Sequence, residues 1–509
     1  MAKANNNLAA SDNIKTSYVV VLFAASVLYI VSCAPGPVWQ DSGVIQYRVF
    51  HNDIEGRLGL ALSHPLFYML AIGVKYIFPG GFGYEVNIVT AVISAVAVAN
   101  LFLLLRLWLG STLPALVGAL TLGLSHTFWR HAAIPETYNL VVALLLLELI
   151  MLLQYAKTGR VVYLYLLSLV NGLAIANHML ASLAFICYLV LLVVLTAKKK
   201  VGGKDLALMV LLWVIGALPY EYLIVRNILE SGDLWSTMAS AVFGASWRSD
   251  VLNVSLSARI VKENFMWMAL NFPTPNALLL FVGLWGLYKV SPKRWFANVL
   301  LALLVLFFVF AFRYTIVDRY AFFIPSYCIA SILIGVGASR VVNGKHGKLL
   351  GCLVVAFAFV AVPVYMAAPA VAKKLGIASG RAREIPYRDD YVYFLRPWRT
   401  GYIGPEKFAE EIFGMVEPDA IVYADDTTAP PLLNTQQIKR MRPDVKIISY
   451  VGSSEGSPEF NEHTIGELLT NRPVYVVSAV QRYCPEYLLE RYSFVPAGTI
   501  WRVGDRKGE

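Results

Sequence analysis

The sequence predicts a polytopic α-helical membrane protein with a small α/β domain at its C-terminal end. Of its 509 residues, 58% are hydrophobic and only 15% are charged, whereas soluble proteins have about 25% charged residues. The apolar residues form long runs, such as residues 140–153 and 299–312. Beyond about residue 367 the sequence changes to polar clusters, prolines and short apolar runs. These features exclude a soluble enzyme, a disordered chain and a collagen-like repeat.

Eleven apolar segments are candidates for spanning helices, each of which needs about 20 apolar residues. They are residues 17–35, 84–106, 112–128, 136–155, 161–177, 179–197, 205–225, 276–290, 295–312, 320–338 and 349–367. Residues 65–78 are too short to span, and Pro79-Gly80-Gly81 follows them, so we expect a re-entrant or interfacial helix there. No A-x-A-like cleavage site follows the first segment, which predicts an uncleaved first span.

The net charge of +10 would suggest nucleic-acid binding in a soluble chain. Here the basic residues lie in short clusters between apolar segments, and such clusters favour the cytoplasmic side of a membrane. With residues 1–16 in the cytoplasm, every second loop is rich in lysine and arginine, and these loops contain only two acidic residues. The odd number of spans in a transmembrane domain at 17–367 then places residues 368–509 outside the cytoplasm. We therefore expect a membrane partner and no nucleic acid.

The C-terminal segment predicts a small α/β domain. Short apolar runs at 420–423, 445–450, 474–477 and 494–503 are typical of strands, and residues 431–441 of a helix between the first two. This order suggests some parallel pairing. The five cysteines form no CxxC pair and no metal-ligand spacing with histidine.

With this topology, the unusual polar residues collect in the outer loops, above all in the first at 36–83 and the long one at 226–275. They are Asp41, His51, Asp53, Glu55, His64, Arg130, His131, Glu136, Asn177, His178, Trp247, Arg248, Asp250, Arg313, Asp318 and Arg319. Ionisable groups beside apolar segments usually mark a substrate or ion path. Asp41 could deprotonate a hydroxyl, while arginine and histidine side chains neutralise a phosphate leaving group.

Seven sequence segments support a family resemblance. They are WQDSG (39–43), SHPLFY (63–68), YEVN (84–87), FWRHAAIPETYNL (128–140), GLAIANH (172–178), VDRYAFFIP (317–325) and ADDTTAPPLL with RMRPDVKII (424–448). The ordered set resembles the polytopic glycosyltransferases of the GT-C superfamily. More narrowly, it resembles the protein O-mannosyltransferase-related family of bacteria and of the animal endoplasmic reticulum. Many relatives have an acidic residue where this chain has Val44, and a proline where it has Leu66.

The resemblance implies a membrane glycosyltransferase with a polyprenyl-phosphate-linked sugar donor, mannose being the family's sugar, and a protein or glycan acceptor. It implies that Asp41 is the catalytic base. Because the sequence offers no clear second nucleophile, we expect a single displacement that inverts the anomeric carbon. The expected substrate- or phosphate-binding residues are His64, Glu136, Asn177, His178, Arg313 and Arg319. No cofactor is certain; Asp41 and Glu136 could hold a divalent cation.

Structural roles remain open for these residues, because carboxylates such as Asp41 and Glu136 also stabilise helix N-termini. The alternative function is a transporter or flippase of a lipid-linked or small polar substrate, and a receptor or scaffold is a third. A transporter usually has charges near the bilayer midplane, where this chain has only Glu148. The bacterial type of the tail favours an inner membrane with the N-terminus cytoplasmic and the C-terminal domain periplasmic.

Overall fold

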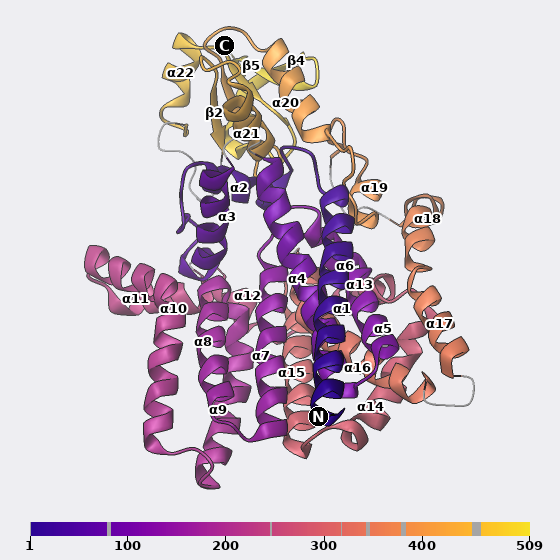
Figure 1. Cartoon of the computed structure of the whole chain (residues 1–509). Coiled ribbons are helices and arrows are strands. Elements are labelled where there is room, and N and C mark those ends of the chain that lie inside the picture. Colours follow the sequence, from indigo (N-terminus) through magenta and orange to yellow (C-terminus); the bar gives the residue numbers. More distant parts are fainter. Residues whose placement is uncertain are drawn as a thin grey trace.

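The computed structural model is a bundle of long helices with a small sheet domain at one end (Figure 1). The structure describes residues 2–78, 83–244, 247–316, 318–342, 347–377, 383–449 and 460–508. The predicted turn at 79–81 lies outside these residues. The N-terminus lies at the end of the bundle opposite the sheet domain.

Eight helical segments within the described residues are long and apolar enough to cross a membrane. They are 13–32 in α1 (Ala2–Ser32), α4 (Tyr84–Leu109), α7 (Tyr138–Thr158), η2 with α9 (Met179–Ala197), α10 (Gly203–Ser231), α15 (Arg294–Arg313), η4 with α16 (Arg319–Val342), and 349–374 in α17 (Gly347–Ala358) and α18 (Ala361–Lys374). A ninth would join α13 (Ala258–Asn271) to η3 and α14 (Pro275–Val290) across a bend of 110°. The chain is thus an integral, multi-pass membrane protein.

Helices occur at all eleven positions where a span was predicted, but three of these helices are not full spans by themselves, so the described residues contain eight candidate spans, or nine with the bent pair. The predicted segment 112–128 divides into α5 (Thr112–Gly123) and the short α6 (His126–Ala132), because the chain turns at Leu124 and Ser125. The predicted segment 161–177 forms α8 (Val162–Asn177), which has 16 residues. The predicted segment 276–290 is the second half of the bent pair.

Close helix packing inside the bundle depends on glycine. A Cβ atom at Gly172 of α8 would overlap the backbone of α10, and one at Gly216 of α10 would overlap the backbone of α8. Small residues let helix backbones approach closely in a membrane, where lipid already solvates apolar side chains. These two helices are therefore held at backbone contact.

The mid-span carboxyl of Glu148 is fully engaged by protein. Its Oε1 accepts a hydrogen bond from Asn171 Nδ2 at 2.9 Å, and its Oε2 accepts one from Tyr188 Oη at 2.8 Å. Asn171 Oδ1 in turn accepts from Trp213 Nε1 at 3.1 Å. A buried polar group is tolerated in a membrane when neighbouring helices satisfy its hydrogen bonds. This network thus joins α7, α8, α9 and α10.

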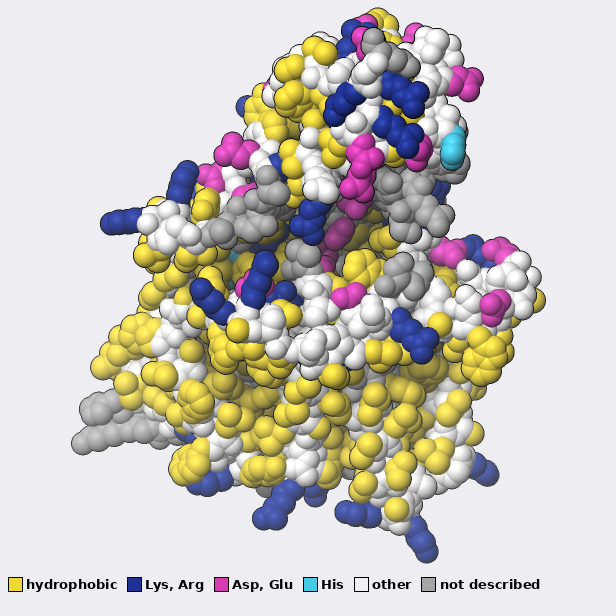
Figure 2. Space-filling view, turned by 180° about the vertical axis from the view of Figure 1, so that it is seen from behind, with side chains coloured by type: hydrophobic (Ala, Val, Ile, Leu, Met, Phe, Trp, Pro, Cys, Tyr) yellow, Lys and Arg dark blue, Asp and Glu magenta, His cyan; other side chains and the backbone are white. Residues whose placement is uncertain are grey.

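Shorter helices lie toward the end of the bundle that carries the sheet domain (Figure 1). They are α2 (Gln40–Phe50), η1 (Leu60–Leu62), α3 (Pro65–Ile77), α11 (Leu234–Phe243), α12 (Arg248–Leu252) and α19 (Asp390–Leu395). At the opposite end, lysine and arginine side chains project below an apolar belt (Figure 2). Exposed Lys198, Lys199 and Lys200, in the loop after α9, are among the basic residues expected in the cytoplasm.

The C-terminal domain contains a five-stranded mixed sheet in the order β2-β1-β3-β5-β4. Its elements are α20 (Gly404–Met415), β1 (Ile421–Ala424), α21 (Ala429–Lys439), β2 (Lys446–Ser449), α22 (Ile465–Asn471), β3 (Val474–Val476), α23 (Glu486–Arg491), β4 (Tyr492–Ala497) and β5 (Ile500–Arg506). β1 pairs in parallel with β2 and β3, as predicted. The predicted strand at 494–503 is instead a hairpin of β4 and β5, because the chain reverses at Gly498, whose φ is +65°.

The two faces of the sheet are both buried. Along β1, Val422 and Ala424 face a core formed with α20 and α21, whereas Ile421 and Tyr423 face a core formed with α22 and α23. The first of these cores also contains Trp39, which precedes α2 and is fully buried. Through Trp39, the first outer loop therefore packs into the core of the C-terminal domain.

Candidate active site

The predicted catalytic residue, Asp41, lies in the first turn of α2. Gln40, directly before it, has a φ of +60°, a conformation that costs free energy in a residue with a side chain. The next residue, Ser42, is buried, and its Oγ donates a hydrogen bond to Glu136 Oε1 at 2.7 Å. This bond holds the first turn of α2 against Glu136, which lies two residues before α7. Two of the predicted site residues, Asp41 and Glu136, are thus close enough for their charges to interact.

Asp41, Glu136 and Asp318 form a carboxylate cluster. The Asp41 side chain is accessible to solvent, yet protein surrounds it, and this desolvation together with the negative charge of Asp318 raises its pKa to about 6. Burial raises the pKa of Glu136 to about 8; the charges of Asp41 and Asp318 add to this effect, against the opposing hydrogen bond from Ser42. Burial also raises the pKa of Asp318. At neutral pH Glu136 is therefore protonated and Asp41 largely ionised.

A fourth carboxylate comes from the C-terminal domain. Asp426 lies between β1 and α21, and its pKa is raised by burial and by the charges of Asp425 and Asp41. The same loop touches α2 directly, because the backbone N–H of Gln40 donates to Thr427 O at 3.4 Å. Figure 2 shows a hollow between the C-terminal domain and the bundle, with acidic side chains inside it.

Three buried arginines lie around the ring of Tyr393, and we name them the arginine cluster. They are Arg130 of α6, and Arg388 and Arg399 of the segment that leads into the C-terminal domain; their exposed fractions are 3%, 7% and 4%. All three guanidinium groups lie over the ring of Tyr393, at 5.3, 4.1 and 4.5 Å from its centroid. Arg130 is also close enough to Glu136 to oppose the rise in its pKa.

The arginine cluster has unused hydrogen-bonding capacity. Within the described residues, Nε and Nη1 of Arg130, Nη1 and Nη2 of Arg388, and Nε of Arg399 have no hydrogen-bond partner. Burial and the charge of Arg130 lower the pKa of Arg399 to about 10. Arg388 has a counter-charge, since its Nε lies 2.7 Å from Asp390 Oδ1, but three buried cations with too little counter-charge are costly. An anion bound among these groups would remove that cost, and a phosphate oxygen suits guanidinium geometry.

The predicted residues His64, Asn177 and His178 lie together. His64 Nδ1 and Asn177 O are 2.8 Å apart, and the two imidazole rings are 4.6 Å apart between centroids. His64 has a left-handed backbone with a φ of +51°. Burial lowers the pKa of His64 to about 4 and holds that of His178 well below its ordinary value. Both rings are neutral at pH 7, so they can form hydrogen bonds but cannot neutralise a phosphate.

The two arginines predicted to bind phosphate are held by other protein groups. Arg319 pairs with Glu263 and donates from Nε to Asn264 Oδ1 at 3.1 Å. Arg313 Nη1 donates to the carbonyl oxygens of Val251 and Asn253, both at 2.6 Å. Their phosphate role stays a prediction, whereas the arginine cluster has free donors.

Other polar residues of the first outer loop shape that loop. Arg48 Nη2 donates to Ser63 O at 3.1 Å, its guanidinium lies 3.7 Å from the ring centroid of Tyr68, and it pairs with Asp53 at 3.5 Å. Glu55 pairs with Arg226 of α10. These contacts fix the chain between Asp41 and His64.

No group of three or more histidine, cysteine, aspartate or glutamate side chains in the described part of the chain is arranged to hold a metal ion. The charges of Asp41, Glu136 and Asp318 interact, but these three carboxylates are not arranged as the ligands of a metal ion. The residues present therefore give no support to a resident divalent cation.

Arg130 is one of the outer polar residues identified from the sequence, but it was not among the predicted site residues. Arg388 and Arg399 were in neither group. The signal that could have found them is the basic and aromatic stretch YRDDYVYFLRPWRT at 387–400. Cationic side chains that alternate with aromatic ones can be buried in the protein, because cation–π contacts stabilise them there. The position of that stretch against α6 depends on tertiary packing, which its sequence does not show.

Comparisons with known proteins support the resemblance. Residues 61–202 match the family model of the protein O-mannosyl-transferase TMEM260 N-terminal domain. This region contains four of the seven motif segments, including those of His64, Glu136 and His178; Asp41 precedes it. A search of curated proteins gave no match.

Among solved structures, ArnT from Cupriavidus metallidurans bound to undecaprenyl phosphate has a TM-score of 0.60 and 14% identity, covering 96% of this chain and 98% of that one. An Archaeoglobus fulgidus oligosaccharyltransferase, in complex with Zn and sulfate, has a TM-score of 0.47 and 13% identity, covering 95% and 73%. The second likeness is too distant to carry an argument. The chain thus has the fold of the polytopic GT-C glycosyltransferases and, over residues 61–202, the sequence pattern of the protein O-mannosyl-transferase family, which confirms the resemblance seen in its motifs.

Proposed function

We propose that this protein is a membrane glycosyltransferase that moves a sugar from a polyprenyl phosphate carrier to an acceptor hydroxyl. The observation that carries the proposal is Asp41, an accessible carboxylate with a pKa of about 6, close to Glu136, a protonated carboxyl that is itself close to the buried Arg130. A general base works best when its pKa lies near the working pH.

The reaction would be a single displacement. The acceptor hydroxyl gives its proton to the Asp41 carboxylate, and its oxygen bonds to the anomeric carbon. The bond from that carbon to the phosphate oxygen breaks, and its electron pair leaves with the polyprenyl phosphate. One displacement inverts the anomeric carbon. Glu136, protonated and bonded to Ser42, supports the turn that carries Asp41 without adding a charge beside it.

The donor phosphate would bind at the arginine cluster. Polyprenyl phosphate gains negative charge as it leaves, and preorganised cations stabilise charge that develops in the transition state. Arg130 suits this role best, since it lies next to Glu136 and has two unused donor nitrogens in the described structure. The undecaprenyl phosphate bound in the similar ArnT structure supports a carrier of this chemical class.

The sugar would lie between Asp41 and the neutral pair of His64 and His178, whose rings can hydrogen-bond to sugar hydroxyls. The name of the matching family favours mannose, and a protein or glycan hydroxyl as the acceptor. The basic end of the bundle supports a cytoplasmic N-terminus. The active face would then be outside, in the periplasm if the membrane is a bacterial inner membrane.

The test uses the purified protein in nanodiscs with a panel of polyprenyl-phosphate sugars and a mixture of peptide and glycan acceptors. Release of free polyprenyl phosphate, with transfer of one sugar, would support the proposal and identify the donor. In reconstituted vesicles, movement of the intact donor between leaflets without release would instead identify a flippase. Activity that survives exhaustive EDTA treatment would exclude a required divalent cation.

A further inference from the structure

The C-terminal domain contacts the turn that carries Asp41 at several points. α21 packs on α2, and Gly43, two residues after Asp41, lies against Pro430 of α21. A Cβ atom at Gly43 would lie 2.6 Å from the Pro430 Cβ, so only glycine permits this approach. At the other end of the interface, Gln437 Nε2 lies 2.9 Å from His51 Nε2.

The most buried contact between the two parts is made by Asn434 of α21, whose side chain is fully buried. Its Nδ2 donates to Gly43 O at 2.8 Å and to Gln46 Oε1 at 3.3 Å. Both acceptors belong to α2, and both lie within five residues of Asp41. A hydrogen bond to the backbone of the first turn constrains that turn in a way that apolar packing does not.

Gln46 carries the connection further into the bundle. Its Oε1 also accepts from Val38 N at 3.1 Å, and its Nε2 donates to Gly83 O at 3.1 Å and to Asn87 Oδ1 at 3.0 Å. Asn434, Gln46 and Asn87 are all fully buried. We name these three residues the amide chain. It joins α21 to α2, the helix that carries Asp41, and to the first turn of α4.

We propose that the C-terminal domain positions the catalytic carboxylate through the amide chain, with Asn434 as the positioning residue. The proposal rests on the proposed function, in which Asp41 is the base. The domain is then a working part of the active site rather than only an acceptor-binding module. A displacement of about 1 Å at a reacting group can cost about a hundredfold in rate, so a loosened first turn should lower kcat strongly.

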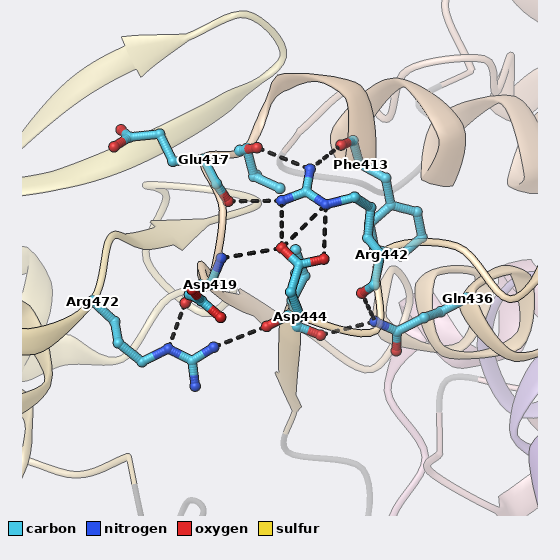
Figure 3. A network of polar contacts seen from close by, with 9 residues as sticks. Phe413, Glu417, Asp419, Gln436, Arg442, Asp444 and Arg472 are labelled. Atoms are coloured by element: carbon cyan, nitrogen blue, oxygen red, sulfur yellow. Dashed lines mark hydrogen bonds and ion pairs between the residues drawn. The ribbon is translucent and has the colours of Figure 1, made fainter.

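The test compares Asn434→Leu with Gln436→Met, two uncharged substitutions of similar size on the same helix. Gln436 is a matched control because its Nε2 also donates to two carbonyl oxygens, those of Arg442 and Val445, both at 2.8 Å. Figure 3 shows that these bonds belong to a polar network inside the C-terminal domain, built around Arg442 and Asp444. The control thus loses the same kind of bond without touching α2.

We expect Asn434→Leu to lower kcat at least about tenfold, with the donor KM and the binding of polyprenyl phosphate little changed. The acid limb of the kcat profile should move to lower pH. The titratable groups near Asp41 include Asp318, Glu136 and Asp426. A first turn that moves away from them loses the burial and the repulsion from Asp318 that raise the pKa of Asp41. Gln436→Met should keep the wild-type kcat and profile.

A folded Asn434→Leu protein with wild-type kcat and acid limb would overturn the positioning role, and so would equal effects in both variants. If Asn434→Leu does not fold, Asn434→Ala is measured by the same criteria. Asp41→Asn is measured alongside. An active Asp41→Asn enzyme would overturn the proposed function, and the positioning role with it; an inactive one, together with a normal Asn434→Leu, would overturn the positioning role alone.

Discussion

The protonated state of Glu136 makes stability depend on pH in a predictable way. Its pKa is about 8, against an ordinary value of 4.5. Between these values the folded protein binds more protons than the unfolded chain, so stability is complete below about pH 4.5 and falls as the pH rises through 8. The difference corresponds to roughly 5 kcal/mol at most. Solvent reaches part of the side chain, so we expect about 2 kcal/mol.

Glu136→Gln removes this dependence, because glutamine keeps the shape of the neutral acid and can still accept the hydrogen bond from Ser42. Thermal unfolding of both proteins in one detergent, followed by tryptophan fluorescence from pH 5 to 8, measures the effect. The two apparent melting temperatures should agree near pH 5 and separate toward pH 8, with the variant more stable. Parallel curves across the whole range would refute a buried, protonated Glu136.

Three further predictions concern the site. Arg130→Gln should weaken binding of polyprenyl phosphate about 10- to 100-fold, because a hydrogen bond to a charged group contributes about 1.5–3 kcal/mol. Competition with a labelled carrier lipid measures this affinity, and unchanged binding would place the phosphate elsewhere. Asp318→Asn should move the acid limb of kcat/KM to lower pH, yet leave it above 3.8, since burial of Asp41 remains after the neighbouring charge is gone; a shift to higher pH would contradict this arrangement. Gly43→Ala should destabilise the protein by about 1–3 kcal/mol, in thermal unfolding, through its overlap with Pro430; wild-type stability would contradict that contact.

Much of the fold could be predicted because the membrane imposes simple rules. Apolar length predicted eleven spanning helices; each place is helical, but only eight of these helices, or nine with the bent pair, are candidate spans in the described residues. The predicted span at 112–128 continued past the point where the chain turns, although the apolar run ends at Leu124 and α6 contains His126, Arg130 and His131. In the C-terminal domain, short apolar runs predicted β1, β2 and β3 correctly. The run at 494–503 did not show that the chain reverses at Gly498.

The position of a candidate site residue could be predicted where a single sequence segment contains a recognisable motif. WQDSG placed Asp41 in the first outer loop, and its first turn indeed meets Glu136 through Ser42. Segments far apart in the chain were harder, because their contacts depend on how the C-terminal domain docks. The arginine cluster joins α6 to a segment more than 250 residues later, and the amide chain reaches Asn434. The aromatic residues that follow Arg388 are a local signal, but they do not show that its segment packs near α6.

The most direct test of the account is the turnover of the Asp41→Asn enzyme. Wild type and variant are compared in nanodiscs with the donor that the panel identifies, and bound polyprenyl phosphate is measured in the same samples. Loss of the general base should lower kcat at least about a hundredfold, with carrier binding and thermal stability unchanged. Wild-type turnover in Asp41→Asn would contradict the central claim that this carboxylate activates the acceptor.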